Sequence, residues 1–248
     1  MKTKIKIEDL TKEFDDHLVT NHLNLSIPAQ QMTLIIGRSG EGKSVLLKQI
    51  IGLIAPTSGH IFIDGIDITT LSTQEHRNLL AKLGYVFQFA ALLDSLNVFE
   101  NIGITLIEEG VNHEKVLAIV KEKLALVNLD EEHLYKYPSE LSGGMKKRVG
   151  LARTLISNPS IILYDEPTTG LDPITARVIH QLMHKMQLTL QVTSVVISHD
   201  LEMLKYADNI ALLYDGKIRY FGPAQEAWES NDPYIYQFIR GLSEGPIQ

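Results

Sequence analysis

One glycine-rich stretch of this sequence has the residue types and spacing of a phosphate-binding loop. Glycines let backbone N–H groups curve around phosphate oxygens, and the start of a helix adds a favourable dipole. In such a loop Lys43 would reach the β- and γ-phosphates of a nucleotide, and the Ser44 hydroxyl would bind Mg²⁺. A short apolar run precedes the stretch and a helical pattern beginning at Val45 follows it, which favours this interpretation over a glycine-rich loop with an incidental lysine. The pattern G-x-x-x-x-G-K-[ST] is matched by Gly37, Arg38, Ser39, Gly40, Glu41, Gly42, Lys43 and Ser44, and we count Val45 with the predicted nucleotide contacts.

Two adjacent carboxylates, Asp165 and Glu166, end a second apolar run at 161–164. Successive residues of a strand point to opposite faces, so the two carboxylates can have different tasks. Asp165 suits the coordination of Mg²⁺, and Glu166 suits activation of the attacking water. Taken alone, the pattern fits better with a strand that simply ends in a turn. The phosphate-binding loop in the same chain favours the catalytic interpretation.

A second candidate anion site is the sequence LSGGM at 141–145. Its Ser142, Gly143 and Gly144 precede an amphipathic helix, and small residues at a helix N-terminus can bind an anion. One nucleotide does not need two such loops from the same subunit. We therefore expect Ser142–Gly144 to contact a nucleotide held by another subunit; the alternative is a simple helix N-cap.

The elements that must position these loops follow from hydrophobic patterning. Buried-strand patterns near 34–36, 160–165 and 193–198 alternate with helical ones, which indicates an α/β fold with a mainly parallel sheet. Alternating apolar residues near the N-terminus indicate an antiparallel β element. Asp64-Gly65 and Asp215-Gly216 are typical turns of two hairpins. Residues from about 89 to 157 have a mostly helical pattern.

Composition excludes several classes of function. The chain has 248 residues, 44% of them hydrophobic, as expected for a globular protein. Its formal charge of −7 argues against nucleic acid as a partner, and the absence of cysteine excludes disulfides and thiolate metal sites. We expect no signal peptide and no membrane span, since the apolar runs are far shorter than the ~20 residues a bilayer requires.

Taken in order, these motifs resemble the nucleotide-binding subunit of ABC transporters. The order is the phosphate loop, Gln88 after a strand, LSGGM, ILYDEP, Gly170-Leu171-Asp172, and His199 after a strand. The resemblance implies a RecA-like P-loop NTPase core with an antiparallel β subdomain and a helical subdomain. It implies one ABC ATPase domain over residues 1–222 (helical subdomain about 89–157), followed by a C-terminal extension at 223–248. It also implies a head-to-tail homodimer that encloses ATP and Mg²⁺.

The same resemblance assigns roles to single residues. Gln88 would touch Mg²⁺ or the attacking water, His199 would contact the γ-phosphate, and Asp172 would lie at the dimer interface. Phe14 lies where the family has an aromatic residue stacked on adenine. His199 and Gln88 would be unremarkable without the family match. Met145 departs from the glutamine that commonly ends the family's signature, which affects no catalytic group.

A narrower resemblance is to the Mla/Mce (MlaF-type) branch, carried by LSGGMKKRVGLAR, FQFAALLDSLNVFENI and the tail DPYIYQFIRGLSEGPI. It implies phospholipid transport across the bacterial envelope with an MlaE-type integral permease. It further implies a small regulatory subunit, an Mce-domain lipid-binding protein, and a peripheral location on the cytoplasmic face of the inner membrane. Alternatives are the ATPase of another importer or lipoprotein-release system, a soluble ABC protein, and a degenerate cassette. The tail helix would pack on the chain's own core or on a partner.

Overall fold

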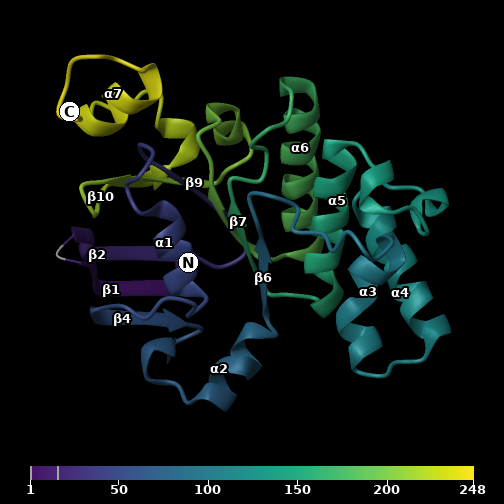
Figure 1. Cartoon of the computed structure of the whole chain (residues 1–248). Helices are drawn as coiled ribbons and strands as arrows, with labels where there is room; N and C mark the ends of the chain where they lie inside the picture. The colour runs from purple at the N-terminus through teal and green to yellow at the C-terminus, as the bar shows by residue number, and fades with distance from the viewer. Residues whose placement is uncertain (1, 16) are drawn as a thin grey trace.

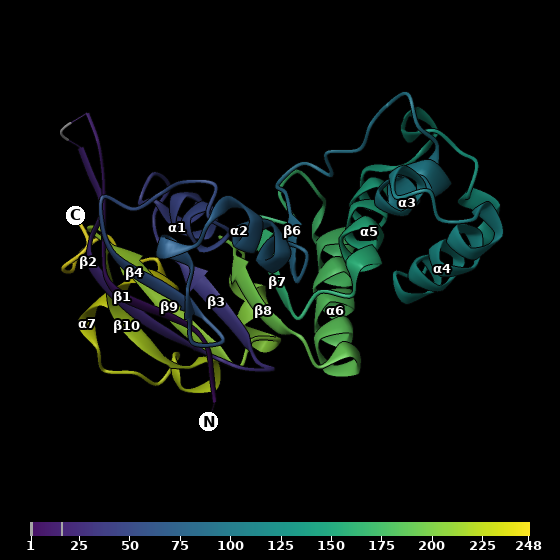
Figure 2. The same cartoon turned by 90° about the horizontal axis from the view of Figure 1, so that it is seen from below.

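The computed structural model describes residues 2–15 and 17–248 of the chain. Two β-sheets form the part drawn at the left and centre of Figure 1, and a group of helices forms the part at the right. Figure 2, seen from below, shows α1 and α2 on one side of the larger sheet. Helix α6, next to α5, packs on the other face of the sheet. The predicted α/β fold is confirmed.

The larger sheet is the element that carries the site. It has six strands in the order β10-β9-β3-β8-β7-β6. Every pairing is parallel except that of β10 with β9, which is antiparallel. The strands are β3 (Met32–Ile36), β6 (Leu83–Val86), β7 (Ile161–Asp165), β8 (Thr193–Ile197), β9 (Asn209–Tyr214) and β10 (Lys217–Pro223).

The smaller sheet is the antiparallel element expected near the N-terminus. Its strand order is β2-β1-β4-β5. The strands are β1 (Thr3–Phe14), β2 (His17–Pro28), β4 (Ser58–Ile63) and β5 (Ile66–Asp67). Both predicted Asp-Gly turns are confirmed: Asp64 and Gly65, and likewise Asp215 and Gly216, have positive φ angles between 51° and 81°. This conformation matches the right-handed twist of a two-residue hairpin.

Seven α-helices connect and cover the sheets in the described residues. The three helices α3, α4 and α5 form the part at the right of Figure 1, within the stretch with a helical sequence pattern. Short 3₁₀ turns join several elements. The helices are α1 (Lys43–Ile50), α2 (Thr73–Leu80), α3 (Val98–Glu108), α4 (His113–Leu126), α5 (Gly143–Thr154), α6 (Pro173–Leu190) and α7 (Pro233–Arg240).

The central strands are apolar on both faces because each face packs against a different core. In β7, Ile162 and Tyr164 join the core shared with α3–α6, whereas Ile161 and Leu163 join the core shared with α1 and the antiparallel sheet. Alternation with a period of two residues produces this division. Such two-sided burial is what a parallel sheet requires, and it holds the strand ends, and therefore the loops that follow them, in fixed positions.

The C-terminal helix α7 packs on this chain's own core. Ile235 and Ile239 are buried in the cluster that includes the central sheet, and the Tyr234 ring lies 6.0 Å from that of Tyr214 on β9. The segment that follows folds back, because the buried Gln237 amide accepts a hydrogen bond from Ile247 N at 2.7 Å and donates one to Ile247 O at 3.0 Å. Of the two expected packing surfaces for the tail helix, the chain's own core and a partner, the structure shows the first.

Candidate active site

The predicted site residues gather at one edge of the larger sheet. The phosphate-binding loop follows β3, Gln88 follows β6, Glu166 follows β7 and His199 follows β8. These strands are parallel, so their carboxyl ends lie at the same edge. That edge is where open α/β sheets bind their ligands.

The phosphate-binding loop ends at a helix with unpaired N–H groups. Gly42, the N-cap of α1, has φ 85°, and no described side chain caps this helix. A side chain at Gly42 would also collide with Val19, 2.4 Å away. The first-turn N–H groups of α1 are therefore available to an anion.

Lys43 is held inside this loop. Its Nζ donates hydrogen bonds to the carbonyls of Gly37 at 2.8 Å and Arg38 at 2.7 Å. Burial lowers the pKa of Lys43, while the charges of Glu166, Glu41 and Asp165 act in the opposite direction. With three carboxylates nearby to favour its charged form, Lys43 is placed to act as a cation within reach of bound phosphates.

The first carboxylate, Asp165, is fixed by two hydroxyl groups. Ser44 Oγ donates to Asp165 Oδ1 and Tyr85 OH donates to Asp165 Oδ2, both at 2.8 Å. The link between Ser44 and Asp165 brings together two of the predicted metal ligands. Tyr85 lies on β6 and was not predicted, because a tyrosine in a buried strand has no sequence signal that sets it apart from a core residue.

The second carboxylate, Glu166, lies beside the histidine assigned to the same site. Glu166 Oε1 is 2.9 Å from His199 Nε2. Burial raises the pKa of Glu166, although His199 and Lys43 nearby act in the opposite direction. Glu166 also has φ 49°, a left-handed conformation that costs about 1–3 kcal/mol in a residue with a side chain. Strain of this kind, with a raised carboxylate pKa, is typical of a catalytic position.

A cavity of about 500 Å³ unites the loop with these residues. It includes Gln88, Glu166 and His199, the three predicted catalytic residues, and it adds Thr169, whose Oγ1 lies 3.4 Å from Glu166 Oε2. The predicted residues that line it are Ser39, Gly40, Gly42, Lys43, Ser44, Val45, Gln88, Glu166 and His199.

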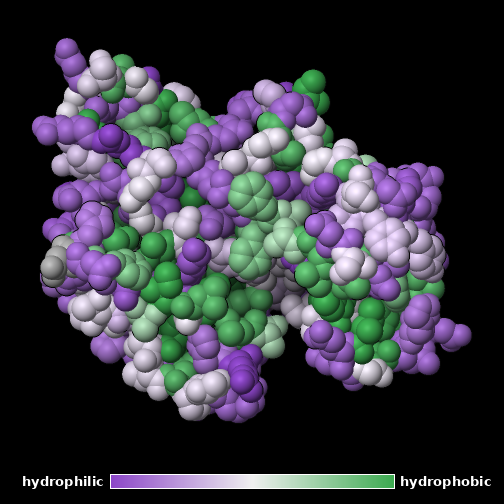
Figure 3. Space-filling view, in the orientation of Figure 1, coloured by the Kyte–Doolittle hydropathy of each residue, from purple (hydrophilic) through white to green (hydrophobic). Residues whose placement is uncertain are grey.

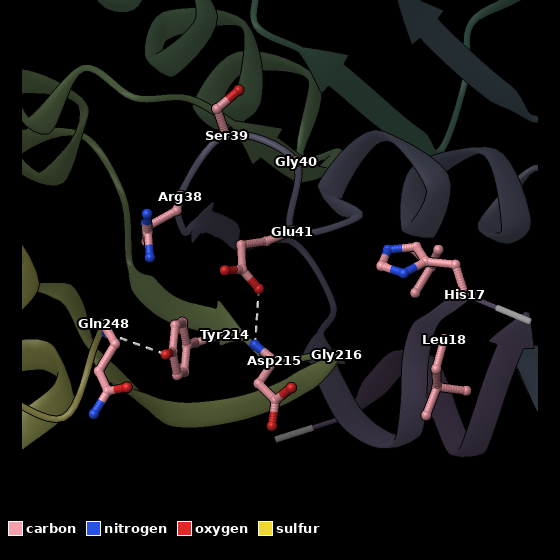
Figure 4. A pocket seen from close by; sticks show the side chains of 11 residues that line it. His17, Leu18, Arg38, Ser39, Gly40, Glu41, Tyr214, Asp215, Gly216 and Gln248 are labelled. Carbon is pink, nitrogen blue, oxygen red and sulfur yellow. Dashed lines mark hydrogen bonds between the residues drawn. The ribbon is translucent and has the colours of Figure 1, made fainter.

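A second cavity of about 370 Å³ adjoins the first, since Ser39 and Gly40 line both. Figure 4 shows Arg38 and Tyr214 on one side of it and His17 and Leu18 on the other. Glu41 accepts a hydrogen bond from Asp215 N at 2.8 Å, which ties the loop to the turn between β9 and β10. Phe14 is not one of the described residues that line these two cavities. It is 41% exposed, and its ring centroid lies 4.5 Å from Lys12 Nζ.

The remaining predicted residues form a separate group. Ser142 caps α5 by accepting a hydrogen bond from Met145 N at 3.3 Å, and Asp172 caps α6 by accepting from Ile174 N and Thr175 N at 3.0 Å each. A side chain at Gly144 would lie 2.6 Å from Thr175 Cγ2, so the two helix starts are in contact. Neither Ser142–Gly144 nor Asp172 is among the described residues that line the two cavities. These positions stay predictions for a site shared with another subunit.

The fold and the site together define a P-loop nucleotide-hydrolysing protein. A loop with the pattern of a phosphate-binding loop adjoins Glu166, a half-buried carboxylate with a strained backbone that is suited to accept a proton from water. The model of the ABC transporter family matches residues 20–169, and the chain belongs to this family. The protein is an ATPase that binds ATP, as predicted.

Two relatives and one solved structure show which ABC proteins this chain is similar to. The probable ribonucleotide transport ATP-binding protein mkl of Mycobacterium tuberculosis is 38% identical over 249 residues, covering 100% of this chain and 69% of that protein. The intermembrane phospholipid transport system ATP-binding protein MlaF of Haemophilus influenzae is 37% identical over 246 residues, covering 98% of this chain and 93% of that protein. The predicted likeness to MlaF-type ATPases is confirmed.

The solved structure is a dimeric ATP-binding cassette in a post-hydrolysis state, bound to ADP and Pi. It is 32% identical, with a TM-score of 0.80, and covers 89% of this chain and 98% of that one. This match confirms the predicted ABC ATPase fold.

Two features are absent from the described residues. None of the helices in the described part of the chain combines the length and apolarity that crossing a bilayer requires. Within residues 2–15 and 17–248, no group of three or more His, Cys, Asp or Glu is arranged to hold a metal ion.

Proposed function

We propose that this chain is the ATP-hydrolysing subunit that energises phospholipid transport between membranes of the bacterial envelope. The observation that carries the proposal is the match to MlaF, which spans almost the whole of both chains. The match to mkl, whose name states ribonucleotide transport, leaves about a third of that relative uncovered. Transport of another substrate is the alternative that this second match favours.

The proposed reaction uses the larger cavity. Lys43 and the N–H groups of α1 stabilise charge on the phosphoryl oxygens, Glu166 accepts a proton from the attacking water, and His199 contacts the γ-phosphate. Gln88 orients that water. The arrangement supports these roles because all four residues line one cavity.

The residues present also fit Mg²⁺. The Ser44 hydroxyl and the Asp165 carboxylate lie in direct contact, and hard oxygen ligands of this kind, completed by phosphate and water, are what Mg²⁺ prefers. Ser44, Asp165 and Gln88 would hold the ion. It would supply positive charge to the β- and γ-phosphate oxygens.

The site is completed by a second copy of the chain. We assign Ser142–Gly144 and Asp172 to this contact, because they present two capped helix starts outside the cavities of their own subunit. In a symmetric dimer each subunit gives its partner the same residues. Phe14 and the smaller cavity would then receive the base and the ribose.

The transmembrane partner would be an integral permease of the MlaE type. Figure 3 shows apolar side chains gathered in the middle of the view, between the sheet-containing part and the helical part. The exposed aromatic and aliphatic residues after β6 are Phe87 at 46%, Phe89 at 75% and Leu93 at 46%. Exposed apolar side chains that gather in one patch are typical of a surface that contacts another protein. The chain would lie peripherally on the cytoplasmic face of the inner membrane, with a small regulatory subunit and an Mce-domain protein as further partners.

We expect the complex to move phospholipid. The tagged chain would be purified with its permease from detergent-solubilised membranes and reconstituted into vesicles that contain a fluorescently labelled phospholipid. Transfer of this lipid to acceptor vesicles should require ATP, and a complex that carries Glu166→Gln should give none. ATP-dependent uptake of ribonucleotides or amino acids, without lipid transfer, would overturn the proposal.

A further inference from the structure

The loop that carries Gln88 is held by the helical part of the molecule. Residues 88–97, here called the 88–97 loop, contain no helix or strand. The buried Asn101 side chain of α3 donates hydrogen bonds to the carbonyls of Leu93, Leu96 and Asn97, at 3.1, 2.7 and 3.0 Å. It accepts one from Leu93 N at 2.8 Å. The second half of the loop is thus tied to α3.

The first half of the 88–97 loop is tied to α5 by two basic side chains. Lys147 Nζ donates to the Gln88 carbonyl. Arg153 donates to the carbonyls of Ala91 at 2.8 Å and Ala90 at 3.2 Å. Gly150 lies between Lys147 and Arg153 in the sequence of α5, and a Cβ atom added there would lie 3.2 Å from the Ala90 carbonyl oxygen. The backbone of the loop therefore lies directly on α5, which presents cations and a glycine to it.

Lys147 is an unusual member of this contact. It is only 8% exposed, and in the part of the chain that the structure describes its ammonium group makes this one hydrogen bond and no ion pair. Burying a cation is unfavourable unless it is paired. The neighbouring Lys146, by contrast, is only half-buried and has no described hydrogen bond or ion pair. A buried lysine whose only partner is the Gln88 carbonyl points to a role at that carbonyl.

The position of this carbonyl determines what the Gln88 side chain can reach. Gln88 lines the cavity together with Lys43, Glu166 and His199. Lys147 also lies on the helix whose N-cap is Ser142. Helix α5 is therefore hydrogen-bonded, through Lys147, to Gln88 in the cavity of its own subunit. The same helix begins with Ser142–Gly144, the loop assigned to the partner's nucleotide.

We propose that Lys147 is a positioning residue for ATP hydrolysis, which ties the placement of Gln88 to the placement of α5 and its Ser142–Gly144 loop. A displacement of α5 then moves Gln88 with it, so that Gln88 is aligned only when α5 is seated. This inference rests on the proposed role of Gln88 in hydrolysis.

The test compares Lys147→Met with Lys146→Met in the full chain. Losing the hydrogen bond to the Gln88 carbonyl should lower kcat about 10-fold or more, since small misplacements of catalytic groups have effects of this size. KM for ATP should stay within about twofold, because the phosphate loop is untouched. Hydrogen exchange of the backbone amides at 88–92 should accelerate in Lys147→Met alone. Lys147→Arg, which keeps a charged donor, should recover most of the activity, and Lys146→Met should match the wild type.

Two outcomes would overturn the inference: wild-type kcat in Lys147→Met, or a loss of kcat without faster exchange at 88–92. Should Lys147→Met fail to fold, Lys147→Gln and Lys147→Arg allow the same comparison. Gln88→Ala separates this inference from the proposed function. If Gln88→Ala lowers kcat and Lys147→Met does not, only the positioning role fails. If Gln88→Ala has no effect, the role assigned to Gln88 fails.

Discussion

Replacing Glu166 with glutamine should lower kcat for ATP hydrolysis by roughly 10²-fold or more, the usual contribution of a positioned general base. Glutamine has nearly the same shape as glutamate, but its amide cannot accept a proton from the attacking water. Glu166 lies 2.9 Å from His199 and lines the cavity with Lys43. The adjacent carboxylate, Asp165, is held by Ser44 and Tyr85, so we do not expect it to take over this role.

ATP binding should survive this substitution, because the phosphate loop is intact. The Glu166→Gln protein should therefore accumulate as an ATP-bound dimer in sizing chromatography with ATP and Mg²⁺, while phosphate release stops. The exposed Glu229→Gln is the matched control and should keep wild-type turnover. Near-normal phosphate release by Glu166→Gln would move the role of general base to another residue.

Lys43→Ala should weaken ATP binding and remove most turnover. Hydrogen bonds to charged groups contribute about 1.5–3 kcal/mol each, so loss of the ammonium group should reduce ATP affinity by roughly 10²-fold. Turnover at saturating ATP should fall as well, since charge on the transferred phosphoryl group is no longer stabilised. ATP affinity would be measured by calorimetry and turnover by phosphate release.

Lys48→Ala is the control for the loss of a lysine. Lys48 lies on the same helix α1, but it is exposed, and its ammonium group makes no described hydrogen bond to the loop carbonyls that Lys43 contacts. It should bind and hydrolyse ATP like the wild type. Wild-type affinity and turnover in Lys43→Ala would contradict the assignment of 37–44 as the phosphate-binding loop.

The parts of the site that the sequence predicts are those encoded in contiguous residues. The phosphate loop is one unbroken pattern, and the apolar runs before it and before Asp165 identify buried parallel strands. Once those strands are parallel, Gln88, Glu166 and His199 must lie at one edge of the sheet. The same local logic predicts both hairpins, because an Asp-Gly pair supplies the positive φ angles that the turn requires.

Contacts between distant residues could not be predicted in this way. The Tyr85 hydroxyl on Asp165 and the Lys147 ammonium on Gln88 join residues 80 and 59 positions apart. Neither tyrosine in a strand nor lysine in a helix signals its partner. The exact start of α6 at Pro173 likewise depends on a local contact, because Asp172 accepts hydrogen bonds from Ile174 N and Thr175 N. The helical spacing of apolar residues in the tail predicts a helix, but it does not predict the surface that this helix covers.

The most direct test of the account is a mixture of two inactive variants, because the central claim is that each ATP is hydrolysed between two copies of the chain. Lys43→Ala dimers lack the phosphate-loop lysine at both sites, and Ser142→Arg dimers lack the partner's loop at both sites. In a symmetric dimer, a mixed pair combines both defects in one site and leaves the other site intact. Phosphate release by the mixture should therefore rise well above that of either variant alone. Wild-type hydrolysis by Ser142→Arg alone would contradict the claim that this loop acts in the partner's site.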